Sequence, residues 1–361
     1  MVRPAVRNTD YFPMRLPLLL LLPALLLAAC QAPPRWANQP LRDILFGSCL
    51  NKTEHPMLDR TARLPMDLFV FLGDNIYADT TNMMVMRAKY DALKATPFFQ
   101  SIRRKVPVLA TWDDHDYGMN DAGAAYPMRR ESQAEFFNWL DEPTDSPRRQ
   151  QEGVYYAQTF GPAGRRVQVI LLDTRYFRSP LMRGDHGAEP SGGPYVPNPD
   201  PQATVLGDTQ WRWLEEQLRQ PAEVRLIASS IQFVAEFAGC ESWANFPREK
   251  QRFLELLNRT RANGVLLVSG DRHWCEFSRM DGPLGYPLYD LTASAMTQRH
   301  PRGTPTPNRF RHLPKTFHEA NVGRLRIDWQ PPDPRLTLQI VDVNGQVQVE
   351  QSLHLSDLRP R

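Results

Sequence analysis

The stretch LFVFLGDNIY, residues 68–77, decides which fold this chain can adopt. Its first five residues are all apolar, a run of the length and composition that is typical of a buried strand. Gly73 and Asp74 follow directly, so that a carboxylate lies at the carboxyl end of that strand. Because open α/β folds bind their ligands beyond the carboxyl ends of their strands, Asp74 is a candidate for a functional site.

A second stretch of the same kind occurs much later in the chain. The apolar residues 265–268 (VLLV) precede residues 269–274 (SGDRHW), so that Asp271 also follows a predicted buried strand. Tyr77 and His273 lie close to the two carboxylates in sequence. Two carboxylates at strand ends, with a phenol and an imidazole nearby, indicate a metal centre more than a device that only holds the fold together.

Length and composition are those of a globular α/β protein. The chain has 361 residues, of which 42% are hydrophobic and 23% are charged, which is enough for a sizeable core in one large domain or two smaller ones. The formal net charge is only +3, so nothing in the composition demands a nucleic-acid partner.

Residues 1–29 have the composition of a signal peptide, with arginines, then the apolar residues 16–27, then a cleavage site of small residues. Residues 27–30 (LAAC) resemble a bacterial lipobox, which implies cleavage before Cys30 and attachment of lipid to its sulfur. The alternative is plain secretion with an incidental cysteine. Gln31 is not an aspartate, which for lipoproteins of Gram-negative cells favours the outer membrane.

We therefore expect residues 30–40 to form a tether, with membrane contact through lipidated Cys30. The expected localisation is export to the bacterial envelope, as a lipoprotein on the periplasmic side of the outer membrane. The apolar run before Cys30 is short and contains two prolines, so a permanent transmembrane helix is the less favoured interpretation.

The rest of the chain, residues 41–361, shows alternating strand and helix patterns, as a layered α/β core requires. We expect strands at residues 41–49, 68–72, 106–111, 154–156, 167–172, 224–229 and 265–269, and helices at residues 81–100, 132–140, 208–219 and 247–263. A methionine stripe that includes Met83, Met84 and Met86 is expected to pack in the core, and Asp208 is expected to cap its helix.

The last part of the chain has a different pattern. Residues 323–329 and 336–341 alternate between apolar and polar side chains, and Asn344 and Gly345 form a dipeptide that is typical of a tight hairpin. We expect antiparallel strands here that complete a sheet.

Polar residues with useful chemistry occur just past the predicted strands. They are Cys49, Asp74, Tyr77, Asp114, His115, Asp271 and His273. Scattered structural carboxylates would not share this placement, so we expect these side chains to form one site.

The chemistry that suits such a site is hydrolysis assisted by two metal ions. Two cations about 3.5–4 Å apart can hold both the attacking and the leaving oxygens of an in-line displacement. Asp74 is the natural bridging ligand, and a thiolate or the phenolate of Tyr77 favours Fe(III) or Zn. His273 can supply a neutral imidazole, while Asp114 and Asp271 offer harder oxygens to a second cation such as Ca, Mn or Mg.

Several motifs together resemble the PhoD-like (alkaline phosphatase D) family of the calcineurin-like metallophosphoesterase superfamily. They are residues 47–49 (GSC), 73–77 (GDNIY), 112–116 (WDDHD), 172–176 (LDTRY), 229–232 (SSIQ) and 270–274 (GDRHW). The resemblance extends from about Ile44 to about Ser278 and is specific, because the order, spacing and strand context of the motifs agree. It implies an α/β fold, the four-layer αββα sandwich with mixed sheets, here with a C-terminal antiparallel β segment in one domain at residues 41–361.

The resemblance also implies a role for each candidate. The residues that resemble ligands of Fe(III) are Cys49, Asp74, Tyr77 and His273. Those that resemble ligands of one or more Ca ions are Asp74, Asp114 and Asp271, although the residue types permit Mn, Mg or Zn at the second position. His115 resembles the histidine that contacts the substrate phosphate and protonates the leaving group, and the nucleophile would be a metal-activated hydroxide at a dinuclear or trinuclear site.

Two interpretations of Arg272 remain open. It reaches the substrate phosphate, since arginine suits oxyanions geometrically, or it forms a structural ion pair. We include it with His115 and Asp114 among the candidate catalytic residues.

Other residues near the motifs have structural interpretations beside functional ones. Asn120 and Asp121, just after the third motif, add an oxygen ligand or hold a loop, the second being the more ordinary role. Asp173 and Arg175 are expected to form a buried ion pair that supports the site, and the alternative is a catalytic role. Cys240 and Cys275 pair in a disulfide or remain free, which spacing alone does not decide.

The expected function is that of an exported, metal-dependent phosphatase that hydrolyses phosphate monoesters, diesters or both. One alternative is a strict phosphodiesterase, phospholipase D-like, because a tether at a membrane brings lipid-derived substrates within reach. The other is a catalytically inert envelope lipoprotein that retains the fold. The expected partner is a small phosphate ester or a phospholipid as substrate, and no nucleic-acid partner is evident.

Overall fold

The computed structural model describes residues 1–2, 38–187, 193–236, 239–282, 284–299 and 307–360. The chain divides into two compact units, residues 1–33 and 34–361, and the second unit is described here by itself. The expected signal peptide beyond residue 2, Cys30 and most of the expected tether lie outside the described residues. In the part of the chain that is described, no helix is both long and apolar enough to cross a membrane.

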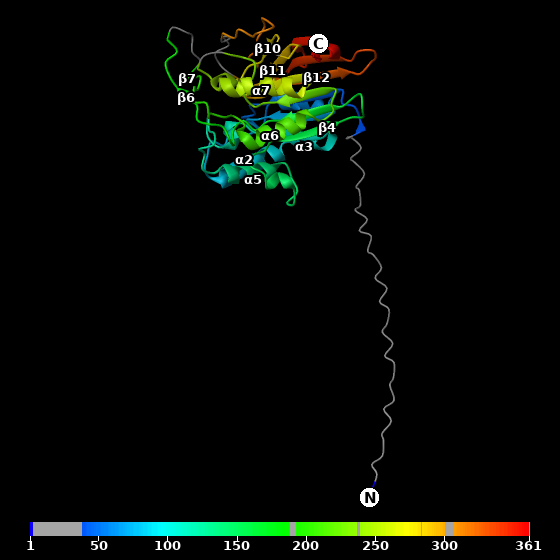
Figure 1. The fold of residues 1–361 in the computed structure, drawn as a ribbon. Helices are drawn as coiled ribbons and strands as arrows, with labels where there is room; N and C mark the ends of the chain where they lie inside the picture. Colours follow the sequence, from blue (N-terminus) through cyan, green and yellow to red (C-terminus); the bar gives the residue numbers. More distant parts are fainter. Residues whose placement is uncertain (3–37, 188–192, 237–238, 283, 300–306, 361) are drawn as a thin grey trace. The chain divides into compact units, whose positions relative to one another are not determined.

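Two six-stranded sheets form the centre of the second unit (Figure 1). The first has the order β14-β13-β12-β1-β2-β3, with β1 (Asp43–Gly47), β2 (Leu68–Leu72), β3 (Val108–Thr111), β12 (Asn321–Asp328), β13 (Arg335–Asp342) and β14 (Val347–His354). Strands β1, β2 and β3 are parallel, whereas β12, β13 and β14 are antiparallel to their neighbours. The C-terminal strands therefore complete this sheet, as the hairpin pattern predicts.

The second sheet is also mixed. Its order is β10-β11-β9-β8-β5-β4, with β4 (Tyr156–Phe160), β5 (Val167–Leu171), β8 (Val224–Ala228), β9 (Val265–Ser269), β10 (Glu276–Met280) and β11 (Leu288–Thr292). The four central strands β11, β9, β8 and β5 are parallel, and the two edge strands are antiparallel. A separate two-stranded ribbon consists of β6 (Met182–Arg183) and β7 (Tyr195–Val196).

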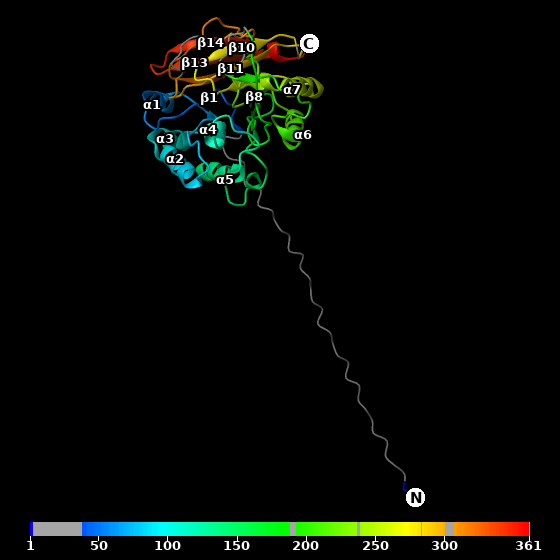
Figure 2. The same ribbon diagram turned by 90° about the vertical axis from the view of Figure 1, so that its left-hand side faces the viewer.

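Helices cover the outer face of each sheet (Figure 2). On the side of the first sheet lie α1 (Pro56–Arg63), α2 (Met83–Ala95), α3 (Pro97–Lys105) and α5 (Arg129–Trp139), and on the side of the second lie α6 (Gly207–Leu218) and α7 (Pro247–Thr260). The single-turn helix α4 (Asp114–Tyr117) and the short 3-10 helices η2 (Pro147–Arg149), η3 (Trp243–Asn245) and η4 (Leu355–Leu358) lie in connections. This is the expected four-layer αββα sandwich.

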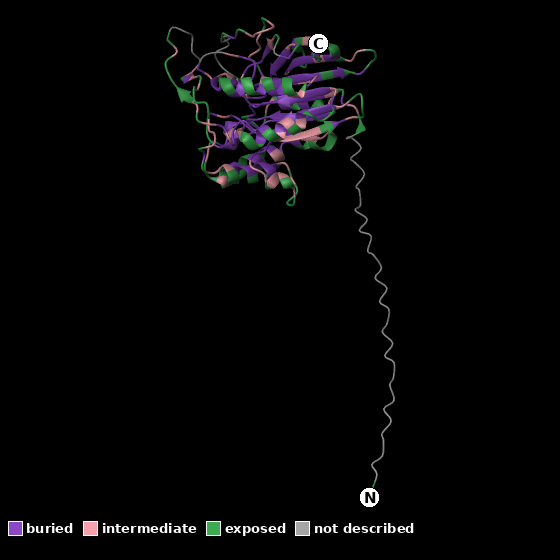
Figure 3. Cartoon of the chain, in the orientation of Figure 1, coloured by how far each residue is buried: buried purple, intermediate pink, exposed green. Residues whose placement is uncertain are grey.

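Strand β2 shows why the chain needs an unbroken apolar run at residues 68–72. All five of its residues are buried. Figure 3 shows that most of the sheets is coloured as buried, whereas the helices outside them also carry exposed residues. Leu68, Val70 and Leu72 belong to the apolar cluster that contains the second sheet, whereas Phe69 and Phe71 belong to the cluster that contains α2, α3 and α5. Because successive side chains of a strand point to opposite faces, a strand between two packed layers must be apolar at every position.

The expected helix at residues 81–100 is two helices, α2 and α3. The hydroxyl of Thr96 accepts a hydrogen bond from the first turn of α3, and Pro97 begins that helix, so the chain turns at this point. The expectation that Met84 packs in the core is wrong, because its side chain is 75% exposed. Met86 is buried, as the methionine stripe predicts.

Two further boundaries differ from the sequence pattern. The strand expected at residues 154–156 is β4, which begins at Tyr156 instead of ending there. Asp208 does not cap its helix, because α6 begins one residue earlier and its N-cap is Leu206. Helix and strand ends depend on backbone hydrogen bonds that a hydrophobic pattern does not specify.

The three cysteines among the described residues are free thiols, so Cys240 and Cys275 do not form a disulfide. Cys275 is fully buried beside β10, and burial raises the pKa of its thiol well above the ordinary value. Such a thiol behaves as a small apolar side chain. Cys49 is also buried, but it lies among polar groups.

Candidate metal centre

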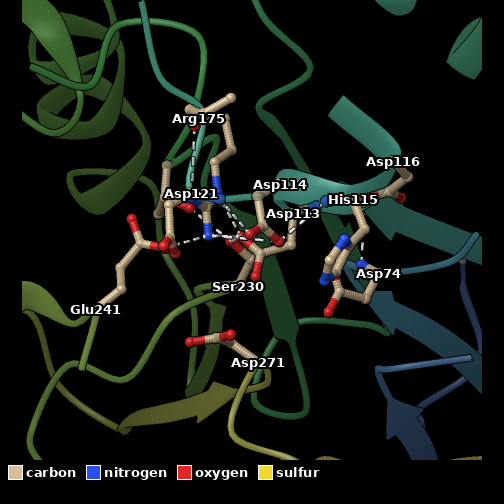
Figure 4. A network of polar contacts seen from close by, with 12 residues as sticks. Asp74, Asp113, Asp114, His115, Asp116, Asp121, Arg175, Ser230, Glu241 and Asp271 are labelled. Atoms are coloured by element: carbon tan, nitrogen blue, oxygen red, sulfur yellow. Dashed lines mark hydrogen bonds and ion pairs between the residues drawn. The ribbon is translucent and has the colours of Figure 1, made fainter. Parts of the chain in front are cut away.

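The carboxyl ends of strands from both sheets meet at one edge of the sandwich. Cys49 follows β1, Asp74 follows β2, and Asp114 follows β3, while Asp271 and His273 follow β9 of the second sheet. Figure 4 shows Asp74, Asp114 and Asp271 around one space, which they reach from three different strands. The structure therefore brings together residues that lie far apart in the sequence.

The two sheets are joined at this edge. Ser48, after β1, forms an isolated parallel bridge with Ser294, after β11, and the N–H of Met296 donates to the carbonyl of Ser48 at 2.9 Å. Gly270 fits here because it has no side chain: a Cβ atom at this position would lie 2.5 Å from Oγ of Ser48. The glycine of the GDRHW motif thus permits the close approach of β9 to the end of β1.

Four of the candidate ligands have a left-handed backbone. The φ angles are 60° for Cys49, 51° for Asp74, 67° for Asp271 and 61° for His273. Residues with a Cβ atom rarely adopt this region, and each instance costs about 1–3 kcal/mol. Strain that gathers in one cluster of polar side chains indicates a functional site, where the fold holds side chains in positions that the backbone alone disfavours.

Asp74 lies in the middle of the candidate ligands. Its Oδ2 is 3.4 Å from Sγ of Cys49 and 3.2 Å from the hydroxyl of Tyr77. The hydroxyl of Tyr77 is in turn 3.0 Å from Nε2 of His273. Sulfur, phenol oxygen, carboxylate and imidazole thus converge within reach of a single ion.

The same carboxylate also belongs to two other groups of possible ligands. Ligand atoms of Asp74, Asp114 and His115 lie within 4.8 Å of one another, and so do those of Asp74, Asp113 and Asp271. Asp74 is therefore placed where one carboxylate can contact more than one cation. The six residues predicted as ligands all belong to this connected cluster: Cys49, Asp74, Tyr77, Asp114, Asp271 and His273.

The electrostatics of the cluster fit bound cations. Burial, together with the charges of Cys49 and Asp114, raises the pKa of Asp74 well above its ordinary value. Burial also raises the pKa of Cys49 and, with the charge of Asp74, the pKa of Tyr77. Oδ1 of Asp74 is buried and has no hydrogen-bond partner within the described residues. Buried anionic groups that repel one another, with an oxygen that lacks a donor, are stabilised by a positive ion.

His273 can serve as a neutral ligand. Burial lowers the pKa of its imidazole to about 4, so the ring is uncharged at neutral pH and offers a lone pair. The backbone N–H of His273 donates to Oγ of Ser294 at 2.7 Å, and the same hydroxyl is 3.0 Å from Sγ of Cys49. Ser294 thus holds one candidate ligand from each sheet.

His115 lies at the exposed rim of the cluster. Its Nδ1 is 2.8 Å from Oδ1 and 2.9 Å from Oδ2 of Asp79, and its ring stacks on Tyr77 at a centroid distance of 4.1 Å. Burial lowers the pKa of His115, but the hydrogen bond with Asp79 and the charge of Asp114 outweigh it and raise the pKa to about 9. The imidazole is therefore protonated at neutral pH, and its Nε2 forms no hydrogen bond within the described residues.

Arg175 does not pair with Asp173, so the expected ion pair between these two residues is wrong. The guanidinium of Arg175 is fully buried and contacts Asp113 at 2.5 Å and Glu241 at 2.8 Å. Asp173 instead accepts backbone N–H groups, those of Arg175 and Val154 among them, at 2.8 Å and 2.9 Å. Both residues support the site, but through different partners, because Arg175 reaches across to the loops after β3 and β8.

Arg272 and Asp121 have definite places. The guanidinium of Arg272 forms an ion pair with Asp271. Asp121 holds its loop: its N–H donates to Oδ2 of Asp114 at 2.6 Å, and its own carboxylate accepts the hydroxyl of Tyr195 at 2.5 Å. Ligand atoms of Asp114, Asp121 and Glu241 also lie within 4.8 Å of one another, so Asp121 meets the geometric condition for both of its expected roles.

Sequence reasoning did not single out several residues that hold the site. They are Asp79, Asp113, Asp116, Glu241 and Ser294. Asp113 and Asp116 belong to the WDDHD motif, so the signal for them was present in the sequence. Glu241 and Ser294 follow no recognisable pattern, and only the packing of the loops reveals them.

Comparison with known proteins gives a consistent result. The sequence profile of a family described as PhoD-like phosphatase matches residues 44–301 of this chain. Alkaline phosphatase D of Bacillus subtilis (strain 168) is 23% identical over 283 residues, which are 67% of this chain and 47% of that protein. The chain thus spans about half the length of this curated relative.

Solved structures share the fold. One described as the structure of PhoD aligns with a TM-score of 0.67 and 17% identity, covering 91% of this chain and 72% of that one. A 5'-nucleotidase precursor from Thermus thermophilus aligns with a TM-score of only 0.36 and 13% identity, covering 89% of this chain and 55% of that one. The first alignment confirms the arrangement of the two sheets and their helices, while the second is too weak to add to it.

Proposed function

The chain belongs to the PhoD-like phosphatase family, and we propose that it hydrolyses phosphate esters with the help of bound metal ions. The observation that most strongly supports this proposal is the position of Asp74. Its carboxylate is shared by three groups of candidate ligands and carries a buried oxygen without a hydrogen-bond partner in the described residues.

The ligand sets follow from the chemistry of the donors. The ligands proposed for Fe(III), with Zn as the alternative, are Cys49, Asp74, Tyr77 and His273. The ligands proposed for Ca, with Mn, Mg or Zn as alternatives, are Asp74, Asp114 and Asp271. Bound cations would supply the Lewis acidity that activates a water molecule and offsets the charge of the phosphate.

The other residues act on the substrate. His115 is held by Asp79 and Tyr77 in a fixed orientation, with its Nε2 free to donate a proton to the leaving-group oxygen. Arg272 lies against Asp271, where its guanidinium can both orient that carboxylate and donate to a phosphate oxygen. None of these groups distinguishes a monoester from a diester, so we propose that both classes are substrates.

Elemental analysis of the purified protein tests the proposal, followed by a panel of phosphate monoesters and diesters on the same sample. We expect iron or another transition metal together with a hard divalent cation. Asp74→Ala should lose both ions and lower the rate of hydrolysis more than about a hundredfold. Loss of a residue that only hydrogen-bonds a metal ligand typically lowers activity about 10–100-fold, and loss of a ligand itself should lower it more.

A matched control removes an aspartate far from the site. Asp145 is exposed in the loop after α5, and Asp145→Ala should keep the metal content and the rate of the unmodified protein. Near-normal hydrolysis by Asp74→Ala, or a metal-free protein that still hydrolyses the esters, would remove the proposed mechanism.

We also propose that the chain is exported and anchored through lipid on Cys30. This rests on the sequence of residues 1–40 alone, where the apolar run is followed by the LAAC motif. Mass spectrometry of the protein from membranes tests it: a mature chain that begins at Cys30 and carries acyl groups is expected, and one that begins elsewhere without lipid contradicts it.

A further inference from the structure

Arginines gather at the edge of the sandwich opposite the candidate metal centre, around the amino ends of β1, β3 and β13. We call this set the basic face; it consists of Arg42, Arg103, Arg104, Arg165, Arg326 and Arg335. All six residues are exposed. They line two neighbouring hollows with volumes of about 470 Å³ and 490 Å³.

Strand pairing places three members of the basic face at the same edge of the first sheet. Arg42 directly precedes β1, and its carbonyl accepts the N–H of Ile327 in β12 at 2.7 Å. Arg326 pairs with Asp43 across β1 and β12, and Arg335 stands opposite Asp328 where β13 begins. The sheet thus fixes the backbone positions of these three arginines, while Arg103 and Arg104 lie at the end of α3 and Arg165 lies in the turn between β4 and β5.

Three acidic residues line the two hollows: Asp43, Asp67 and Asp328. Asp328 is exposed and forms no ion pair within the described residues, whereas the other two are engaged. Asp43 contacts Arg324 at 2.5 Å and Arg326 at 3.4 Å, and Asp67 accepts the backbone N–H groups of Arg42 and Asp43. By contrast, four members of the basic face take part in none of the ion pairs of the described residues: Arg42, Arg104, Arg165 and Arg335. The face therefore carries positive charge that the protein itself does not neutralise.

The chain enters the fold at the same place. Gln39, Pro40 and Leu41 line the second hollow together with Arg103 and Arg104. The turn between β4 and β5 that carries Arg165 packs here too, since a Cβ atom at Gly161 would lie 3.3 Å from Cα of Pro40. The described chain therefore enters the fold beside the basic face, whereas the metal centre lies at the other end of β1, β2 and β3.

We propose that the basic face docks on a bilayer surface that contains anionic phospholipids. Arginine forms paired hydrogen bonds with phosphate oxygens, and each basic residue near an anionic surface raises the affinity by about fivefold. Strands β1, β2 and β3 are parallel, with the metal centre at their carboxyl ends and the basic face at the other end. The docked protein thus holds its metal centre away from the bilayer that anchors it, which favours soluble esters over the lipids of that bilayer.

The test uses the full chain with vesicles of phosphatidylcholine alone or mixed with an equal amount of phosphatidylglycerol. Amide hydrogen exchange is followed in residues 161–166 and 328–335, the turns that carry or adjoin Arg165 and Arg335. We expect slower exchange in both segments on the anionic vesicles only, and a return to the rate in solution at high salt, which screens surface charges.

Charge-reversal variants identify the residues responsible. Arg165→Glu with Arg335→Glu should abolish the slower exchange, because each reversal removes at least a fivefold gain in affinity. Arg212→Glu with Arg248→Glu changes the net charge equally, at exposed positions on α6 and α7. This control variant should keep the slower exchange on anionic vesicles. Both double variants should hydrolyse a soluble ester at the unmodified rate, which shows that they are folded.

Three results would overturn the proposal. The first is equal exchange on the two kinds of vesicle, or failure of the chain to float with the anionic ones. The second is an equal loss of protection in the two double variants, which would indicate a general effect of charge. The third is the same protection by inorganic phosphate without vesicles, which would make the face a site for a soluble anion.

Discussion

The carboxylate of Asp116 holds the backbone of Asp74 in place at the candidate centre. Oδ1 of Asp116 accepts the N–H groups of Asp74 and Asp113 at 3.1 Å and 2.6 Å, and its Oδ2 accepts two hydrogen bonds from Asn75. One buried side chain thus joins the loops after β2 and β3. The left-handed conformation of Asp74 is maintained by these contacts, since an aspartate would not favour it alone.

Asp116→Asn should therefore be destabilising although it changes one atom. Both oxygens of Asp116 accept N–H groups, whereas asparagine would place its own N–H donors against one of these sets of donors. We therefore expect a loss of about 2–4 kcal/mol in the free energy of unfolding. Urea unfolding of metal-free protein measures it. Asp145→Asn, at an exposed position, serves as the control and should change the stability by less than about 0.5 kcal/mol.

His115→Ala separates proton donation from metal binding. We expect the variant to keep its metals and to lose about 10²–10⁴-fold in rate on esters with poor leaving groups, because general acid catalysis contributes that much. Esters whose leaving groups need no proton should slow far less. Steady-state rates on a series of aryl and alkyl phosphates measure the difference, and an equal decrease across the series would show that His115 is not the proton donor.

At the scale of elements, the candidate centre lies where the carboxyl ends of parallel strands from both sheets meet. The parallel strands β1, β2 and β3 and the parallel strands β8, β9 and β11 all end at this edge. Parallel pairing aligns carboxyl ends within one sheet, but it does not bring two sheets together. The bridge between Ser48 and Ser294 provides that connection.

Ser294→Ala tests whether the connection supports the metal ligands. The hydroxyl contacts Cys49 and His273, so its removal should weaken metal binding by about 10–100-fold, as is typical for partners of metal ligands. Titration of the metal-free protein with iron or zinc measures the affinity. Ser352→Ala, on the exposed face of β14, is the matched control and should bind metal normally.

For the molecule as a whole, the proposed ligands come from both halves of the sandwich, so bound cations would cross-link the two sheets. Cys49, Asp74 and Asp114 follow strands of the first sheet, and Asp271 and His273 follow a strand of the second. Ions that bind only the folded state stabilise it by mass action.

Removal of the metals should lower the melting temperature. A free cation at about 100 times its dissociation constant contributes about 2.7 kcal/mol. For the unit formed by residues 34–361, whose unfolding entropy is about 0.7 kcal/mol/K, this corresponds to a shift of about 4 °C. Scanning calorimetry with and without a chelator measures the shift. Asp74→Ala, which should hold no ion, is the control: a chelator that lowers its melting temperature equally would show that the effect does not come from this site.

Much of the fold could be predicted, because buried strands are unbroken apolar runs and their glycine-aspartate ends stand out. Strand β2 matches its predicted bounds, and β9 does too. Strands β10 and β11 and helix α1 were not predicted. The last has only eight residues and begins with His55 as its cap, so local propensity carries little information about it.

The sequence by itself determined the buried strands that precede the site, the family motifs and the identities of the chemically active side chains, since these depend on local hydrophobicity and on residue identity. Only the tertiary structure decided which carboxylates hold the site and which lie within it. Asp113 pairs with Arg175, Asp116 binds backbone N–H groups, and Asp79 orients His115. The reason is physical: a buried carboxylate acts according to the donors and charges around it, and these come from strands and loops that only folding brings together.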